Sequence, residues 1–260
     1  MDLGVAGKTA IVTGGSSGIG LATIRLLVSE GMNVATCARR GDRLQTAMET
    51  IEVPQGQVLL AEEADVLDGA RMSKFVESVA KRTGSIGVLI NNAGRARVSR
   101  FDDTNDAAWR DELELKFFSV INPTRAALPH LKVAKGVVVI VNALLARQPE
   151  PHMVATSAAR AGILNLSRSL ASELAPDVRV NSVLVGLIRT GQWRERYRNA
   201  ETELNESEWL GEIAQKRGIP MGRLAEPEEV ASAMVFLASS RASYITGAAL
   251  EISGGVGRSI

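Results

Sequence analysis

The 260-residue sequence has a single cysteine, no long apolar run and almost no net charge, and each of these shortages excludes a class of protein. Cys37 has no partner for an internal disulfide, which fits a reducing compartment. Because no apolar run reaches the length of a signal peptide or a membrane span, we expect a cytoplasmic protein with no membrane partner. The 30 basic and 29 acidic residues leave no broad field to attract nucleic acid, so we expect a small-molecule partner.

Short runs rich in β-branched residues alternate with longer amphipathic segments, which is typical of a parallel sheet with helices on both faces. We predict one Rossmann-type domain over residues 1–260, of class α/β: a doubly wound, seven-stranded parallel sheet in three α/β/α layers, with ligands beyond the carboxyl ends of the strands. The seven runs lie at residues 8–13, 32–38, 57–63, 87–91, 136–142, 178–185 and 248–253.

One charged, helix-prone segment at residues 190–218 interrupts this alternation and carries Trp193 and Trp209. We predict a helical insertion that covers the site. A solvated pair of surface helices is the alternative, because a charged run often forms only a wet face.

The stretch "TGGSSGIG" at residues 13–20 follows the first predicted strand and opens a helix. Gly14, Gly18 and Gly20 allow a tight turn and a close approach of backbone to pyrophosphate, while the helix N-terminus supplies N–H donors. This pattern predicts a dinucleotide site. The other predicted contacts in the turn are Ser16, Ser17 and Ile19.

The glycine spacing, the later "NNAG" at residues 91–94 and the C-terminal stretch "GRLAEPEEVASAMVFLASSRASYITGAALEISGG" together resemble the short-chain dehydrogenase/reductase family. The resemblance extends from about Lys8 to Gly255. It implies a Rossmann sheet, a nicotinamide dinucleotide, and a homodimer or homotetramer built on the long helices.

Arg39 and Arg40 follow the second predicted strand, close to the expected adenosine ribose. An arginine fork suits a 2′-phosphate, whereas the ribose 2′-OH of NAD(H) is usually met by an acidic residue, so NADP(H) is predicted over NAD(H). The alternative is that both arginines lie in solvent.

The resemblance implies further cofactor contacts from Asp65, Val66, Asn92, Ala93, Gly94, Gly186, Ile188 and Thr190. Asp65 has the alternative role of capping the next helix.

The resemblance also implies four catalytic roles: a tyrosine that donates a proton, a lysine four residues later, a serine that polarises the carbonyl and an asparagine that supports a relay. Aligning the tyrosine-lysine helix with "ATSAARAGI" puts Thr156 at the tyrosine position and Arg160 at the lysine position. Lys116 takes the asparagine position. The serine position falls on Ala143 or Leu145, and the two tyrosines of the chain, Tyr197 and Tyr244, lie elsewhere.

These replacements change the chemistry that is available. A threonine hydroxyl is too weak an acid and an arginine stays protonated, so the usual acid is missing, at a typical cost of about 10² to 10⁴ in rate. We therefore treat four residues as catalytic candidates. Thr156 would orient a substrate oxygen, Arg160 would hold the cofactor ribose or a carboxylate, Lys116 would bring a charge, and His152 would donate a proton.

The proposal for His152 depends on where the helix begins. If the helix begins at His152, that residue shares a face with Thr156 one turn later. A cap or packing role is the alternative for His152, and a surface or interface ammonium is the alternative for Lys116. We predict no metal site.

Two main functions follow from this sequence. The favoured one is an NADP-dependent oxidoreductase that transfers hydride to or from a small carbonyl or alcohol by an atypical or weakened acid–base mechanism. The alternative is a catalytically inactive NADPH-binding sensor or scaffold. A lyase or isomerase that uses the cofactor only structurally is a third, less favoured reading.

Overall fold

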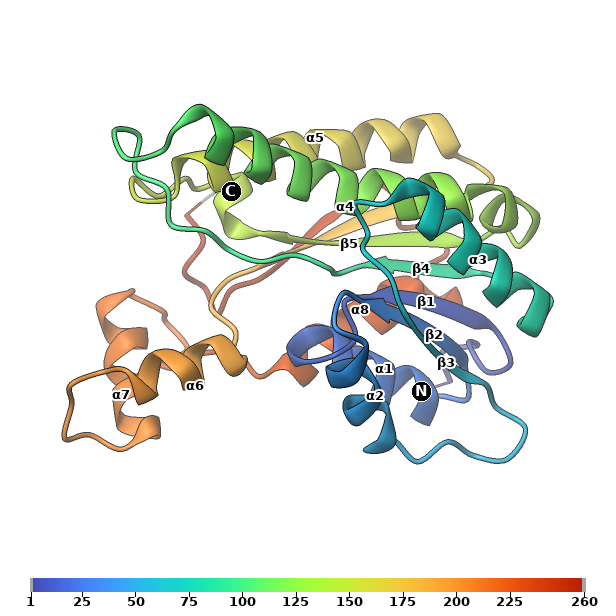
Figure 1. Cartoon of the computed structure of the whole chain (residues 1–260), viewed down its shortest axis with the longest axis horizontal. Coiled ribbons are helices and arrows are strands. Elements are labelled where there is room, and N and C mark those ends of the chain that lie inside the picture. Colours follow the sequence, from blue (N-terminus) through green and yellow to red (C-terminus); the bar gives the residue numbers. More distant parts are fainter. Residues whose placement is uncertain (1, 259–260) are drawn as a thin grey trace.

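The computed structural model describes residues 2–258 and contains one parallel sheet of seven strands in the order β3-β2-β1-β4-β5-β6-β7 (Figure 1). This arrangement is the predicted Rossmann-type α/β fold. The strand order reverses between β1 and β4, so the crevice for a ligand opens at their carboxyl ends. The strands are β1 (Thr9–Thr13), β2 (Asn33–Ala38), β3 (Leu59–Glu63), β4 (Val88–Asn91), β5 (Val137–Ala143), β6 (Arg179–Val185) and β7 (Ala249–Ile252).

Helices cover both faces of the sheet (Figure 1). Helices α1, α2 and α8 contribute to the core cluster on one face, and α3, α4 and α5 contribute to the cluster on the other. The helices are α1 (Gly18–Ser29), α2 (Gly41–Glu49), α3 (Gly69–Thr83), α4 (Asp106–Val133), α5 (Val154–Leu174), α6 (Gly191–Arg198), α7 (Glu206–Lys216) and α8 (Pro227–Ala238), with short 3-10 turns η1 (Leu144–Ala146) and η2 (Ser240–Ala242).

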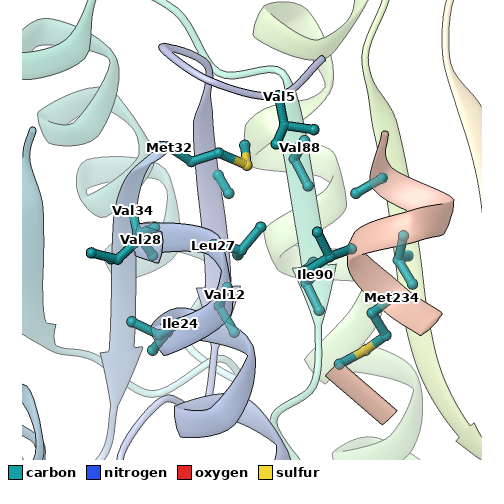
Figure 2. Packing of buried hydrophobic residues seen from close by; sticks show 14 of the residues in the cluster. Val5, Val12, Ile24, Leu27, Val28, Met32, Val34, Val88, Ile90 and Met234 are labelled. Atoms are coloured by element: carbon teal, nitrogen blue, oxygen red, sulfur yellow. The ribbon is translucent and has the colours of Figure 1, made fainter. Parts of the chain in front are cut away.

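The central strands are buried on both faces because their side chains point alternately into the two helix layers. In β1, Val12 packs with Ile24 and Leu27 of α1, whereas its neighbour Ile11 belongs to the cluster on the opposite face (Figure 2). Full burial of such a side chain stabilises the fold by about 1.5 to 3 kcal/mol. This double-sided packing explains why the strands read as apolar runs rather than as alternating patterns.

Residues 190–218 form α6 and α7, which lie at one side of the sheet in Figure 1. Trp193 and Trp209 of these helices are in aromatic contact, with ring centroids 6.1 Å apart. Both pack against a small separate cluster of buried side chains that includes Leu210 and Ile219. Within residues 2–258, no helix is both long and apolar enough to cross a membrane.

Candidate active site

The carboxyl ends of β1 and β4 are joined by hydrogen bonds that bring the two sequence motifs together. The Thr13 hydroxyl accepts from the backbone N–H groups of Asn92 and Ala93, each at 3.0 Å. The Asn92 side chain donates to the carbonyls of Thr13 at 2.9 Å and Gly14 at 3.1 Å. The glycine turn and the "NNAG" segment therefore lie side by side at the carboxyl ends of β1 and β4.

The glycines of the turn are required by close backbone contacts. Gly14 has φ +76°, and a Cβ there would lie 2.9 Å from Ala93 Cα. A Cβ on Gly20 would overlap the Gly14 carbonyl oxygen, so α1 can begin directly against the turn. Ser17 precedes α1 and its side chain makes no capping hydrogen bond, which leaves its hydroxyl available beside the helix N-terminus. This geometry fits a pyrophosphate group.

Arg39 and Arg40 follow β2 directly, and both are exposed. Within residues 2–258, neither side chain is within ion-pair distance of a carboxylate. Asp65 accepts a hydrogen bond from Leu67 N at 3.0 Å, while the cap of α3 is Asp68. The alternative role of Asp65 as the helix cap is therefore wrong.

The segment after β6 packs close to the glycine turn. Gly186 packs so closely on β7 that a Cβ there would lie 3.0 Å from Ser253 Cα. Thr190 directly precedes α6, and its Cγ2 lies 3.2 Å from the position of a Cβ on Gly18. Together with buried Ile188, these residues place the start of α6 against the glycine turn.

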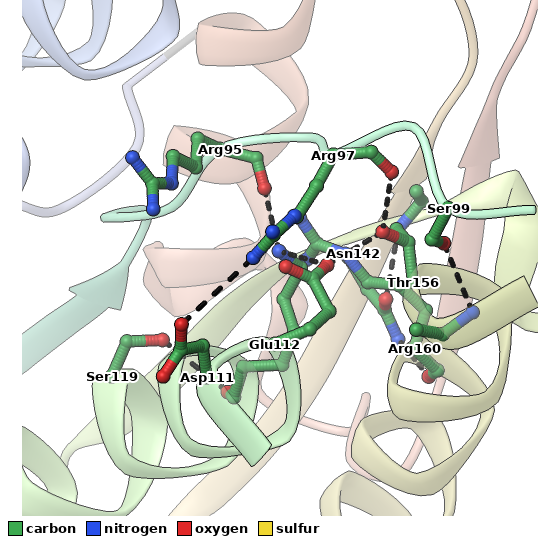
Figure 3. Close-up of polar contacts among 12 residues, drawn as sticks. Arg95, Arg97, Ser99, Asp111, Glu112, Ser119, Asn142, Thr156 and Arg160 are labelled. Atoms are coloured by element: carbon green, nitrogen blue, oxygen red, sulfur yellow. Dashed lines mark hydrogen bonds and ion pairs between the residues drawn. The ribbon is translucent and has the colours of Figure 1, made fainter. Parts of the chain in front are cut away.

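A buried polar cluster occupies the predicted catalytic positions (Figure 3). Glu112 and Lys116 of α4 and Thr156 of α5 have exposed fractions of only 2%, 2% and 1%. Glu112 Oε1 accepts from the Thr156 hydroxyl at 2.5 Å and lies 2.8 Å from Lys116 Nζ. The two helices are thus joined by a carboxylate that neither a substrate nor solvent readily reaches.

The backbone after β4 crosses this cluster and bonds to it. Lys116 Nζ donates to the Arg95 carbonyl at 2.5 Å, and the Thr156 hydroxyl lies 3.1 Å from the Arg97 carbonyl. Ser99 N donates to the His152 carbonyl, and Val154 N donates to the Ser99 carbonyl. This segment and the surrounding packing therefore enclose the side chains of Lys116 and Thr156 in this structure.

Burial shapes the charge state of the cluster. Desolvation, and next the positive charge of Arg160, lower the pKa of Lys116 to about 8, although the hydrogen bond and charge of Glu112 oppose the shift. Desolvation also lowers the pKa of Arg160 to about 10, which leaves the guanidinium charged at neutral pH. Glu112 is therefore the group that favours the charged forms of both cations.

The Arg160 guanidinium makes a single hydrogen bond with the described residues. One terminal nitrogen donates to the Val141 carbonyl at 2.9 Å. The other lies 3.8 Å from the position of a Cβ on Gly94, and the buried Nε has no hydrogen-bond partner among the described residues. Because a buried donor without a partner is costly, this guanidinium fits an oxygen of a bound ligand.

His152 does not lie on the same helical face as Thr156, because α5 begins at Val154. The condition under which the sequence analysis paired the two residues, a helix that begins at His152, is therefore not met. The imidazole is 37% exposed, and its Nε2 lies 3.3 Å from Glu150 Oε2, which also pairs with Arg217 at the end of α7. Of the four catalytic candidates, only His152 and Arg160 retain appreciable exposure.

Glu112 is the residue that the sequence analysis missed. The available signal is its spacing of one helical turn before Lys116, but such pairs usually lie on exposed helix faces.

The two tyrosines of the chain lie outside the buried cluster. The Tyr197 hydroxyl donates to the Leu204 carbonyl, and Tyr244 is fully exposed, so neither serves as an acid in the buried cluster.

The fold and the glycine turn define a Rossmann-type nucleotide-binding protein, and comparisons with known proteins identify its family. A family model described as enoyl-(acyl carrier protein) reductase matches residues 14–257. The 3-oxoacyl-[acyl-carrier-protein] reductase FabG of Chlamydia trachomatis serovar D is 32% identical over 251 residues, which span 96% of this chain and 97% of the relative.

Solved structures agree with this assignment. A short chain oxidoreductase from Pseudomonas aeruginosa PAO1, described as containing an atypical catalytic center, is 50% identical with a TM-score of 0.95, over 99% of this chain and 100% of that one. L-Sorbose reductase from Gluconobacter frateurii, complexed with NADPH and L-sorbose, is 31% identical with a TM-score of 0.94, over 100% of both chains. The chain belongs to the short-chain dehydrogenase/reductase family. It is a dehydrogenase/reductase, and its family uses a nicotinamide cofactor.

Proposed function

We propose that this protein is an NADPH-dependent reductase of a small carbonyl compound, with Arg160 and His152 in place of the family's usual acid. Cofactor choice rests on Arg39 and Arg40, which are exposed and without carboxylate partners at the carboxyl end of β2. Three of the similar structures were solved with NADPH, one of them from Pseudomonas aeruginosa PAO1 at 49% identity. An arginine fork can bind the 2′-phosphate through paired hydrogen bonds.

The observation that carries this proposal is the Arg160 guanidinium, whose buried Nε has no hydrogen-bond partner among the described residues and whose second terminal nitrogen lies near Gly94. The residues that we propose to hold the cofactor extend from the glycine turn through Asn92–Gly94 to Gly186, Ile188 and Thr190, and the contacts of Thr13 with Asn92 and of Thr190 with Gly18 support this assignment. When bound, the dinucleotide supplies the hydride. Arg160 then holds an oxygen of the ribose or of the substrate, and its positive charge stabilises negative charge that develops on the carbonyl oxygen.

Proton delivery is assigned to His152. Lys116 and Thr156 are enclosed by the segment after β4, whereas His152 is 37% exposed in the turn before α5. A histidine can donate a proton near neutral pH and regain it from solvent. In this proposal Glu150, within 3.3 Å, orients the imidazole and is itself held by Arg217.

The test of the catalytic assignment is turnover on a panel of small ketones, aldehydes and sugars with NADPH. We expect His152→Ala to lower kcat by about 10²-fold while NADPH affinity stays unchanged. His130→Ala is the matched control, since His130 lies in the last turn of α4. Unchanged turnover of His152→Ala would remove His152 from the mechanism.

The test of cofactor choice is charge reversal at the end of β2. We expect Arg39→Glu with Arg40→Glu to weaken NADPH binding at least about 100-fold and to leave NADH binding within about threefold, because only NADPH carries the 2′-phosphate. Arg82→Glu, an exposed change near the end of α3, is the control. Equal weakening for both dinucleotides would contradict the proposed role of the arginines.

We also propose a homodimer or homotetramer built on the long helices α4 and α5. Helix α4 exposes Leu113 and Phe118, at 38% and 43%, which a self-association surface would cover. Light scattering after size-exclusion chromatography tests this, and a monomeric mass at micromolar concentration would contradict it.

A further inference from the structure

Glu112 lies at the centre of the buried cluster, and its chemical role differs from that of every family position discussed above. We propose that Glu112 is a positioning residue which holds residues 94–99 in place over the site through Lys116 and Thr156. The catalytic positions of α4 and α5 then serve to anchor this segment, while substrate chemistry takes place at its exposed side. The effect on cofactor binding rests on the proposed function, but the effect on the segment itself does not.

The contacts of the Lys116 ammonium support this role. Lys116 carries a charge that burial disfavours, so its ammonium needs acceptors. It has two among the described residues: Glu112 Oε1 at 2.8 Å and the Arg95 carbonyl at 2.5 Å. Glu112 therefore keeps Lys116 charged and directed at the backbone of Arg95.

Thr156 forms the second link between Glu112 and residues 94–99, and its hydroxyl can donate only one hydrogen bond at a time. A hydroxyl has one hydrogen, and two acceptors lie within reach: Glu112 Oε1 at 2.5 Å and the Arg97 carbonyl at 3.1 Å. The charged, closer carboxylate takes the larger share of that hydrogen. The hydrogen bond from Thr156 to Arg97 (the Arg97 arm) is therefore weaker than the one from Lys116 to Arg95 (the Arg95 arm). We expect the backbone at Arg95 to be held more firmly than the backbone at Arg97.

The anchored segment leads out of the cofactor wall and is itself strongly basic. It continues from Asn92–Gly94, which is bonded to the glycine turn, and it ends at Ser99, which pairs with the start of α5. Between these ends, the Arg95 and Arg97 side chains are exposed. Figure 3 shows the segment passing over Glu112 and Thr156, with the Arg95 side chain directed away from Glu112.

These exposed arginines provide a direct assay, because trypsin cleaves after arginine and needs a locally opened backbone. Limited trypsin digestion of the cofactor-free protein, read by mass spectrometry, reports cleavage after Arg95 and Arg97. Cleavage after Lys81 and Arg82, in the last turn of α3, is the internal reference for general unfolding.

We expect Glu112→Ala to raise cleavage after Arg95 and Arg97 at least about tenfold relative to the α3 reference. Glu112→Gln keeps an oxygen acceptor for Lys116 but removes its negative charge, so we expect a rise smaller than that of Glu112→Ala. Glu114→Ala, an exposed carboxylate on the same helix, is the matched control and should change nothing.

Two results would overturn the inference. One is unchanged cleavage of the segment in Glu112→Ala; the other is an equal rise at the α3 reference, which would show general loosening instead of local release. Thr156→Val provides a second variant that keeps the ion pair, and we expect a smaller rise at Arg97 with Arg95 unaffected. Equal release at both positions in Thr156→Val would contradict the ranking of the two arms.

A calorimetric titration separates this inference from the proposed function. If wild type binds NADPH and Glu112→Ala binds it about tenfold more weakly, the segment helps to form the cofactor site. If wild type does not bind NADPH while the digestion result holds, the proposed function fails and the positioning role stands.

Discussion

Removal of the buried ammonium gives the most demanding prediction. Lys116→Met leaves Glu112 as a carboxylate that is 2% exposed and has lost its paired cation 2.8 Å away. Breaking a buried ion pair from one side costs about 3 to 5 kcal/mol. For a chain of this size, where 1 kcal/mol corresponds to about 2 to 4 °C, the melting temperature should fall by about 10 °C.

The double variant makes this reasoning specific. Glu112→Gln with Lys116→Met leaves no buried charge in the pair, and the Gln amide still has hydrogen-bonding groups for Thr156. We expect it to be more stable than Lys116→Met alone, with a coupling free energy of about 2 to 3 kcal/mol in a double-mutant cycle. Urea unfolding of the four proteins measures this coupling. Additive single effects, with no recovery in the double variant, would refute the buried pair.

Three other predictions concern the pH dependence of stability, the glycine turn and the segment that contains α6 and α7. The pKa of Lys116 is about 8 in the folded protein and 10.5 ordinarily, so between these pH values the unfolded state binds more protons than the folded state. The free energy of unfolding should therefore rise by about 1.4 kcal/mol per pH unit in this range. Urea unfolding of Lys116→Met should lack that rise. Gly20→Ala should weaken NADPH binding at least about tenfold by calorimetry, because its methyl group would meet the Gly14 carbonyl and lie 2.6 Å from Asn92 Nδ2; unchanged affinity would contradict the packing. Arg189→Met should speed proteolysis within α6 and α7 while the melting temperature changes by less than about 3 °C, since Arg189 joins Glu206 and Glu226 at a partly exposed position; an unchanged cleavage rate would show that these ion pairs do not hold the segment.

The sheet could be predicted from sequence because its strands are buried on both faces. The run at residues 136–142 is almost entirely apolar, so its limits can be recognised in the sequence. The observed strand β5 occupies Val137–Ala143, within one residue of that run at each end. The glycine turn could be predicted for a similar reason. Gly14 and Gly20 are fixed by backbone contacts that leave no room for a side chain, and such contacts leave a residue pattern in the sequence.

The catalytic region was predicted less well because its geometry depends on contacts between distant segments. Nothing local marks Glu112 as buried, since α4 places it against α5 only after both helices pack on the sheet. The pairing of His152 with Thr156 depended on a helix that begins at His152, and this condition is not met because α5 begins at Val154. Nor does residue type reveal that the segment after β4 encloses Lys116, because that contact is made by a backbone carbonyl.

The most direct test of the proposed function is a calorimetric titration of the cofactor-free wild-type protein with NADPH and, separately, with NADH. Arg39 and Arg40 after β2 and the Nε donor of Arg160, none of which has a partner within residues 2–258, predict micromolar binding of NADPH and at least about tenfold weaker binding of NADH. Absence of binding for both dinucleotides, or a preference for NADH, would contradict it.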